Sequence, residues 1–405
     1  MTMQVQSIGE QKSVYKGELN NELSRILGYW INHTPDYVDG GFVGRIAIDN
    51  QIIADAPKGS VLNARILWTF SAAYNLNKDA VYLQYAERAY QYIADHFIDP
   101  EFGGVYWTVH SKGQPLDTKK QVYAIAFTIY AMSEYYWASG NKRAKDTAIE
   151  LYQLLVKHSY DAVNTGYLEA FTRDWQPIND LRLSAKDANE KKTMNTHLHV
   201  LEAYTNLYRI WPKEALRAQI ITLLHNFLEH FIDADSHHLL LFFDENWNSR
   251  SGLVSYGHDI EATWLLQEAA TAIGDGALLE KIKAVSIPIA EATIKGMDAD
   301  GGLWYEYEPE GDDLIKEKHW WVQAEAMVGF YNAWQISGDS KYLDLSKKIW
   351  DFVKNKILDI KNGEWLWGIN EDDEPMPGED KAGVWKCPYH NSRACIEIIK
   401  RIDKQ

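Results

Sequence analysis

An aspartate-led, aromatic-rich segment recurs six times along the chain at a nearly constant spacing, and this repeat limits the possible folds more than any other feature. Successive copies start 60, 62, 72, 65 and 61 residues apart. Each copy combines a turn, usually with glycine, and a short strand of alternating pattern, such as 303–307. Such a period is typical of supersecondary units that stack to bury a common core. The copies begin at Asp39, Asp99, Asp161, Asp233, Asp298 and Asp359.

Apolar residues recur at helical spacing in the segments that separate these copies. The pattern predicts twelve helices arranged as six hairpins. They span residues 13–31, 61–76, 82–97, 118–139, 142–158, 194–210, 213–231, 257–273, 277–294, 319–337, 341–356 and 386–402.

The terminal helices indicate how these hairpins are arranged. An open solenoid needs polar capping repeats, but segments 13–31 and 386–402 carry as many large apolar residues as the central ones. We therefore predict an all-α fold, an (α/α)6 barrel of six inner and six outer helices with short β-hairpin-like loops at one end. No Pro- or Ser-rich linker interrupts the period, so we expect one catalytic domain over residues 1–405.

Charge and composition exclude several classes of function. The chain has 41 basic and 57 acidic residues and a net charge of −16, which disfavours nucleic acid as a partner. Two cysteines are too few for a disulfide scaffold or a multi-thiolate metal site. We see no secretory signal at the start and no apolar run long enough for a membrane span. We therefore expect a cytoplasmic protein, either a monomer or a weak homodimer.

Aromatic residues make up 13% of the chain. We expect most of these side chains to form a large aromatic core and some to line a pocket for a flat, weakly polar ligand such as a sugar. In a closed barrel, the inner helices begin at one common end. One residue near each of these starts is predicted to face that mouth, and three of the six are histidines. His197 is two residues from one of them and must face elsewhere, and we expect His319 to cap a helix. The six residues are Arg65, Tyr123, His199, His258, Trp321 and His390.

Histidine is the natural proton carrier near neutral pH. Two imidazoles on opposite faces of a carbon can remove a proton from one side and return one to the other. Arg65 could hold the oxyanion that develops when the proton lies next to a carbonyl group. With an aromatic pocket, this chemistry indicates epimerisation or isomerisation at C2 of a reducing sugar.

Two other kinds of site compete with this interpretation. Three histidines and Glu261 could bind zinc, and Glu261 lies three residues after His258. No two of the three histidines share a helix turn, however, and no His-Glu-x-x-His motif occurs, so we expect no metal. A glycoside hydrolase needs two carboxylates across the scissile bond. No pair stands out among the candidates, and the histidines would have no role. The candidates are Asp39, Asp187, Glu261 and Glu325.

At these residues the chain resembles the cellobiose 2-epimerases, within the N-acylglucosamine 2-epimerase superfamily. The resemblance covers essentially the whole chain, and its most specific segments are 63–68, 192–204, 256–265, 318–326 and 385–394. It implies an (α/α)6 barrel that needs no cofactor. It also implies reversible conversion of the reducing glucose of β-1,4-linked disaccharides, such as cellobiose and lactose, to mannose.

The resemblance also implies a role for each site residue. His258 and His390 match the pair that exchanges the C2 proton, while His199 and Arg65 match groups that polarise the oxygens on C1 and C2. Glu261 matches a carboxylate that orients the adjacent histidine and assists ring opening. The remaining positions match substrate contacts: the hydroxyl of Tyr123, the aromatic walls Trp321 and Trp385, and the polar side chains of Asp187 and Asn195.

The choice of substrate stays open within the superfamily. A monosaccharide enzyme, either an N-acylglucosamine 2-epimerase or a mannose isomerase, is the main alternative. The loop at 176–190 is long enough to cover a second sugar ring, which favours a disaccharide. A binding protein without catalysis is disfavoured, because sugar binding alone does not require matched histidines.

Overall fold

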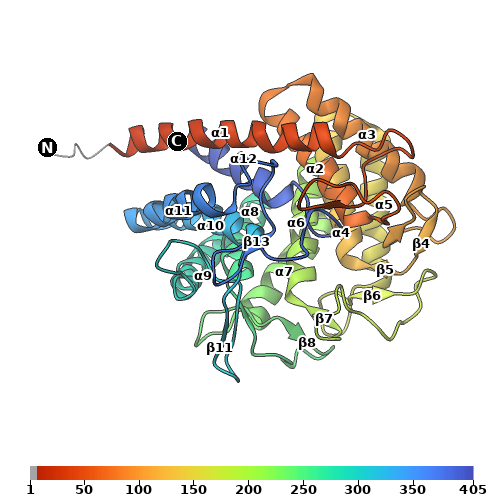
Figure 1. Cartoon of the computed structure of the whole chain (residues 1–405). Coiled ribbons are helices and arrows are strands. Elements are labelled where there is room, and N and C mark those ends of the chain that lie inside the picture. The colour runs from red at the N-terminus through yellow and green to blue at the C-terminus, as the bar shows by residue number, and fades with distance from the viewer. Residues whose placement is uncertain (1–6, 405) are drawn as a thin grey trace, which may run out of the picture.

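The computed structural model describes residues 7–404, so the segment 1–6, on which the expectation of no secretory signal partly rests, lies outside it. Twelve α-helices dominate this part of the chain, as predicted (Figure 1). None of the helices in it is both long enough and apolar enough to cross a bilayer. The six inner helices are α2 (Ser60–Asn77), α4 (Val122–Ser139), α6 (Met194–Ile210), α8 (Tyr256–Ala272), α10 (Trp320–Ser337) and α12 (Tyr389–Asp403).

The outer helices alternate with the inner ones along the chain. Two of them, α7 and α11, end in π-helical turns, η1 (Phe227–Phe231) and η2 (Val353–Ile357). The outer helices are α1 (Ile8–His33), α3 (Ala80–His96), α5 (Lys142–His158), α7 (Glu214–Asn226), α9 (Gly276–Ile294) and α11 (Ser340–Phe352).

Helix contacts close the structure into a ring. Each inner helix packs against the next, α12 packs against α2, and α1 covers α12. Burial distinguishes the two layers: α4 is buried on all sides over most of its length, whereas α5 buries a single stripe at helical spacing. The fold is therefore an (α/α)6 barrel.

Short antiparallel ladders join neighbouring repeats at the end where the inner helices begin. The strand before each inner helix pairs with the loop of the next repeat, and β14 pairs back with β1, which closes the circle. The strands are β1 (Ile46–Ala47), β2 (Lys58–Gly59), β3 (Thr108–Val109), β4 (Pro115–Asp117), β5 (Lys120–Gln121), β6 (Ala170–Phe171), β7 (Lys192–Thr193), β8 (Phe242–Phe243), β9 (Val254–Ser255), β10 (Glu306–Glu308), β11 (Asp313–Ile315), β12 (Lys318–His319), β13 (Gly368–Ile369) and β14 (Asp380–Ala382).

The first copy of the repeat starts at Asp36 and not at Asp39, which corrects the predicted register. An isolated bridge between Pro35 and Phe42 closes its turn, and the aspartate follows the first bridged residue, as Asp99 does in the second copy. The carboxylate of Asp36 accepts backbone N–H groups within the turn, the nearest at 2.9 Å. This aspartate therefore holds the turn together.

A buried lysine reaches five of the six repeat aspartates, a feature that the sequence analysis missed. In each case the lysine lies on the strand before an inner helix, so the ion pair ties that strand to the preceding turn. The strand β9 carries no lysine, and Asp233 lacks this partner. The pairs are Lys58–Asp36 (2.7 Å), Lys120–Asp99 (2.8 Å), Lys192–Asp161 (2.9 Å), Lys318–Asp298 (2.6 Å) and Lys381–Asp359 (2.8 Å).

Candidate active site

The inner helices begin around a cavity of about 510 Å³, and the loop at 181–190 contributes to its wall. All ten residues selected from the sequence line this cavity. Five are the expected catalytic residues Arg65, His199, His258, Glu261 and His390, and five are the expected substrate contacts Tyr123, Asp187, Asn195, Trp321 and Trp385.

Each of the three histidines predicted to face the mouth is fixed through the same ring nitrogen. The Nδ1 atom of His199 lies 2.9 Å from Oε2 of Glu202, and that of His390 lies 2.7 Å from Oε1 of Glu325. The Nδ1 atom of His258 lies 2.8 Å from the hydroxyl of Ser255. A carboxylate acceptor places the imidazole proton on Nδ1 and leaves the Nε2 lone pair free to act as a base.

His258 and His390 both lie close to the indole ring of Trp321. Their ring centroids are 4.8 Å and 5.8 Å from that of Trp321. His258 is the third residue of α8 and His390 the second of α12, so the barrel brings together side chains from distant parts of the sequence. Two imidazoles therefore face the same space from different helices.

Burial lowers the pKa of all three imidazoles. It lowers the pKa of His258 to about 3. For His390, burial and then the nearby guanidinium groups of Arg65 and Arg393 hold the pKa well below its usual range. For His199, burial outweighs the opposing effect of Glu202. The resting imidazoles are therefore neutral near pH 7.

Arg65 is a buried cation surrounded by aromatic rings. Its guanidinium carbon lies 4.2 Å from the ring centre of Phe127 and 4.9 Å from that of Tyr389, and Nη2 donates to the Tyr123 hydroxyl at 2.8 Å. It forms no ion pair with any residue in 7–404, and its buried Nε has no partner there. Such a cation suits a negative charge on a ligand.

Glu261 does not orient the adjacent histidine, which corrects the role expected for it. Its Oε1 accepts from Nη2 of Arg393 at 2.5 Å, while its buried Oε2 has no protein partner among the described residues. Burial and the neighbouring Glu325 carboxylate raise its pKa well above the usual range. Glu261 is therefore suited to carry a proton at the cavity wall.

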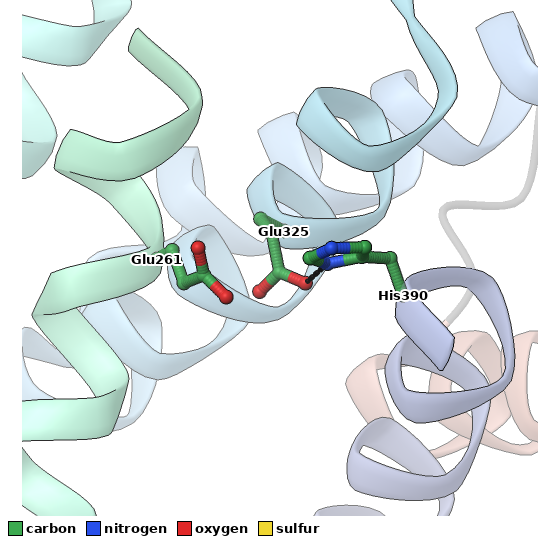
Figure 2. Close-up of side chains that lie close together, drawn as sticks. All are labelled: Glu261, Glu325 and His390. Atoms are coloured by element: carbon green, nitrogen blue, oxygen red, sulfur yellow. Dashed lines mark hydrogen bonds and ion pairs between the residues drawn. The ribbon is translucent and has the colours of Figure 1, made fainter. Parts of the chain in front are cut away.

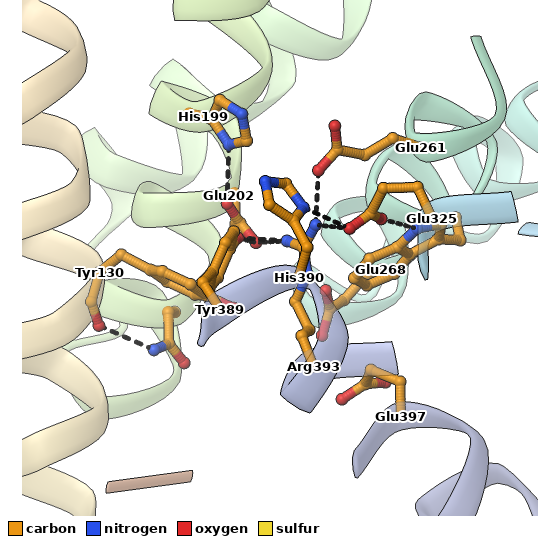
Figure 3. A network of polar contacts seen from close by, with 12 residues as sticks. Tyr130, His199, Glu202, Glu261, Glu268, Glu325, Tyr389, His390, Arg393 and Glu397 are labelled. Atoms are coloured by element: carbon orange, nitrogen blue, oxygen red, sulfur yellow. Dashed lines mark hydrogen bonds and ion pairs between the residues drawn. The ribbon is translucent and has the colours of Figure 1, made fainter. Parts of the chain in front are cut away.

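The carboxylates that do orient histidines are Glu202 and Glu325, and both contact Arg393 (Figure 3). The sequence analysis missed Glu202 and Arg393 and considered Glu325 only for hydrolysis. The i to i+3 spacing of His199 and Glu202 could have indicated that these two residues pair. Nothing in the sequence indicated that Glu325 pairs with His390, because these residues come from different helices, α10 and α12.

Glu261, Glu325 and His390 also lie close enough to be considered as metal ligands (Figure 2). The guanidinium of Arg393, however, donates to both carboxylates, and Glu325 already accepts from His390. A divalent cation would have to displace this buried positive charge. The donor set therefore fits arginine better than a metal.

The outer part of the cavity is acidic, and the sequence analysis did not foresee this. Glu306 and Glu379 line it with Asp187, whose carboxylate accepts from the backbone N–H of Ser184 at 2.8 Å. His319 occupies the N-cap position of α10, as expected, but its side chain makes no capping bond. Instead, its Nε2 pairs with Glu317 at 2.8 Å and its ring lines the cavity.

This fold and cavity define an (α/α)6-barrel enzyme that acts on carbohydrates. The profile of the N-acylglucosamine 2-epimerase (GlcNAc 2-epimerase) family matches residues 40–394. The chain is 49% identical to the cellobiose 2-epimerase of Bacteroides fragilis, over 95% of this chain and 99% of the relative. It is 38% identical to that of Dictyoglomus turgidum, over 96% and 99%.

A solved structure agrees with these relatives. The cellobiose 2-epimerase of Bacillus thermoamylovorans superposes with a TM-score of 0.91 at 41% identity, covering 96% of this chain and all of that one. The chain therefore belongs to the N-acylglucosamine 2-epimerase family and is a carbohydrate epimerase.

Proposed function

We propose that this enzyme interconverts glucose and mannose at the reducing end of β-1,4-linked disaccharides, with cellobiose as the main substrate and lactose as a second. The observation that carries the proposal is the placement of His258 and His390 close to one indole ring in the wall of a shared cavity. The relatives, which are cellobiose 2-epimerases, support the same reaction on cellobiose.

The reaction begins with opening of the pyranose ring. Glu261, protonated at rest, gives its proton to the ring oxygen, while one of the two imidazoles takes the proton of the C1 hydroxyl. Both groups are suited to this step, because burial raises the pKa of Glu261 and lowers those of His258 and His390. The products are a free aldehyde, one imidazolium and one carboxylate.

The second, still neutral imidazole then removes the C2 proton and leaves a cis-enediolate. Arg65 stabilises the negatively charged oxygen, because its guanidinium is held in place before the charge develops. The Nε2 lone pair of His199 accepts a hydrogen bond from the hydroxyl that remains on the neighbouring carbon. Rotation about C2–C3 turns the other face of C2 toward the first imidazolium, which protonates it. When the ring closes, the hydroxyl that attacks C1 returns its proton to Glu261. The new C1 hydroxyl takes its proton from the second imidazole, which becomes neutral again.

This sequence needs neither a cofactor nor an outside acid. A hydrogen leaves C2 and another returns to the same carbon, so substrate and product have the same oxidation state. Every proton that a side chain gives or takes is restored when the ring closes.

The cavity wall supports a disaccharide as the substrate. Trp321 and Trp385 offer faces for the reducing sugar, and Tyr123 and Asn195 offer polar contacts nearby. The loop at 181–190, with Asp187, extends the wall beyond the histidines, where a second ring would lie. A monosaccharide would leave this part of the cavity unfilled.

Incubation with cellobiose, lactose, mannose and N-acetylmannosamine, followed by separation of the products, tests the proposal. We expect each disaccharide to yield its mannose-containing epimer and the monosaccharides to react much more slowly. Faster turnover of mannose or N-acetylmannosamine would identify a monosaccharide enzyme. Release of free glucose from cellobiose would identify a hydrolase.

A further inference from the structure

Arg393 takes no part in the proton transfers proposed above, yet it joins the groups that do. It lies on α12 one turn beyond His390, and its side chain is 1% exposed. Its Nη1 donates to Oε1 of Glu202, and its Nη2 donates to Oε1 of Glu261 at 2.5 Å and to Oε1 of Glu325 at 2.7 Å (Figure 3). One guanidinium group thus serves three buried carboxyl groups from three helices.

Two of these carboxylates each hold the Nδ1 atom of a cavity histidine. A continuous chain of contacts therefore runs from His199 through Glu202, Arg393 and Glu325 to His390. Its members come from α6, α10 and α12 and are all buried. The chain links the two imidazoles to a single positive charge.

The ionisation of these carboxylates decides which nitrogen of each imidazole carries the proton. An ionised carboxylate can only accept, so it fixes the proton on Nδ1 and leaves the Nε2 lone pair toward the cavity. A neutral carboxylic acid can instead donate to Nδ1, which places the proton on Nε2. In that tautomer Nε2 has no lone pair and cannot take a proton from a substrate.

Burial favours the neutral form of a carboxylic acid unless a cation lies close to it. Arg393 is the cation that contacts Glu202 and Glu325 directly, and the structure gives neither carboxylate an ion pair with any other arginine or lysine of residues 7–404. Removing its charge would therefore leave Glu202 and Glu325 buried without a counterion and would favour their protonation.

We propose that Arg393 is a positioning residue that keeps Glu202 and Glu325 ionised and thereby holds the Nε2 lone pairs of His199 and His390 toward the cavity. This inference rests on the proposed function and deepens it. It assigns to a side chain with no substrate contact the control of the tautomer of two histidines.

The variants Arg393→Gln and Arg393→Lys test the inference, with Arg401→Gln as the matched control. Arg401 lies two turns further along α12 and donates to Asn332 at 2.8 Å and Gln335 at 2.7 Å, away from the cavity. In Arg393→Gln we expect kcat at pH 7 to fall by about 10²–10³-fold, within the range of general acid–base catalysis, with KM changed only a few-fold. Arg401→Gln should keep wild-type kcat and KM.

The pH profile separates this role from simple support of the fold. Loss of the positive charge makes both carboxyl groups and both imidazoles easier to protonate, so the acid limb of kcat/KM should move upward by about one pH unit or more. Activity of Arg393→Gln should then recover in part at high pH, where the carboxylates ionise again. Damaged folding would not be repaired by raising the pH.

Imidazole ¹⁵N NMR gives a direct reading of the tautomer. We expect His390 to carry its proton on Nδ1 in the wild type and to shift toward Nε2 in Arg393→Gln at the same pH. If this variant does not fold, Arg393→Lys decides, because one ammonium group cannot replace a fork that reaches both Glu202 and Glu325. We expect at least a tenfold loss of kcat and the same upward shift of the acid limb.

A folded Arg393→Gln, or an Arg393→Lys, with wild-type kcat and a wild-type pH profile would overturn the inference. Failure of the proposed function is distinguishable, because the wild type and Arg401→Gln would then fail to epimerise cellobiose whatever residue occupies position 393.

Discussion

The Nδ1 atom of His390 lies 2.7 Å from Oε1 of Glu325, and both side chains are buried. The carboxylate therefore holds the ring in one orientation and stabilises the positive charge that forms when Nε2 takes a proton. His258 has only the hydroxyl of Ser255 at the corresponding place. The two imidazoles are thus supported differently, and their partners give separate predictions.

Replacing Glu325 by Gln should lower kcat by roughly 10²–10³-fold, because the amide can still accept from Nδ1 but no longer stabilises the imidazolium. KM for cellobiose should change only a few-fold. Glu268→Gln is a suitable control, because Glu268 pairs with Arg209 and does not line the cavity. Wild-type kcat in Glu325→Gln would contradict a proton transfer by His390.

Replacing Ser255 by Ala should have a smaller effect, a loss of about tenfold in kcat, because it frees the His258 ring without removing a charge. Steady-state kinetics with cellobiose measure it, and the exposed Ser249→Ala serves as the control. A loss as large as that of Glu325→Gln would mean that Ser255 does more than orient the ring.

The pKa shifts predict activity at mildly acidic pH. Burial lowers the pKa of His258 to about 3 and lowers those of His199 and His390 as well. Since the proposed reaction starts from neutral imidazoles, kcat/KM should stay near its plateau as the pH falls to 6.5, the pKa of an ordinary histidine, and should decline only below it. An acid limb centred above 6.5 would contradict neutral resting imidazoles.

The acidic wall predicts a preference for uncharged substrates. Asp187, Glu306 and Glu379 line the outer cavity beside Lys186 and Arg182, and Arg182 is paired with Asp180. A disaccharide with glucuronic acid at the non-reducing end should therefore show a kcat/KM at least about tenfold below that of cellobiose. Glu379→Gln should reduce this difference, whereas equal turnover of both sugars by the wild type would exclude a role for the carboxylates in selection.

The repeated lysine–aspartate pairs predict a large effect on stability. Lys192 is fully buried, pairs with Asp161 at 2.9 Å and also donates to the backbone oxygen of Glu245 at 2.8 Å. Lys192→Met should lower the free energy of unfolding by about 3 kcal/mol, because it leaves a largely buried carboxylate without its cation.

Chemical denaturation measures this change, with the exposed neighbour Lys191→Met as the control. That variant should unfold within about 0.5 kcal/mol of the wild type. Equal stability of both variants would mean that the repeated pairs do not stabilise the turns.

The sequence predicted the helices and the barrel because each depends on local patterns. Helical spacing located all twelve helices, and the apolar character of segments 13–31 and 386–402 indicated closure. The same repeat brought His199, His258 and His390 to one mouth, because it placed each near the start of an inner helix.

The hydrogen-bond network could not be predicted in this way, because its partners are distant in the sequence. Glu325 reaches His390 across 65 residues, and Arg393 reaches Glu202 across 191. The family resemblance implied that Glu261 orients the adjacent histidine, but its Oε1 faces Arg393 instead. Side-chain direction on a helix follows from its neighbours as well as from spacing.

The central claim is that His258 and His390 exchange the C2 hydrogen from opposite faces of the sugar. Turnover of cellobiose in D₂O, followed by NMR of the product, tests it most directly. We predict one deuterium at C2 of the mannose unit, and loss of both turnover and exchange in His258→Ala and in His390→Ala. Full turnover without deuterium at C2, or unchanged incorporation in either variant, would contradict the mechanism.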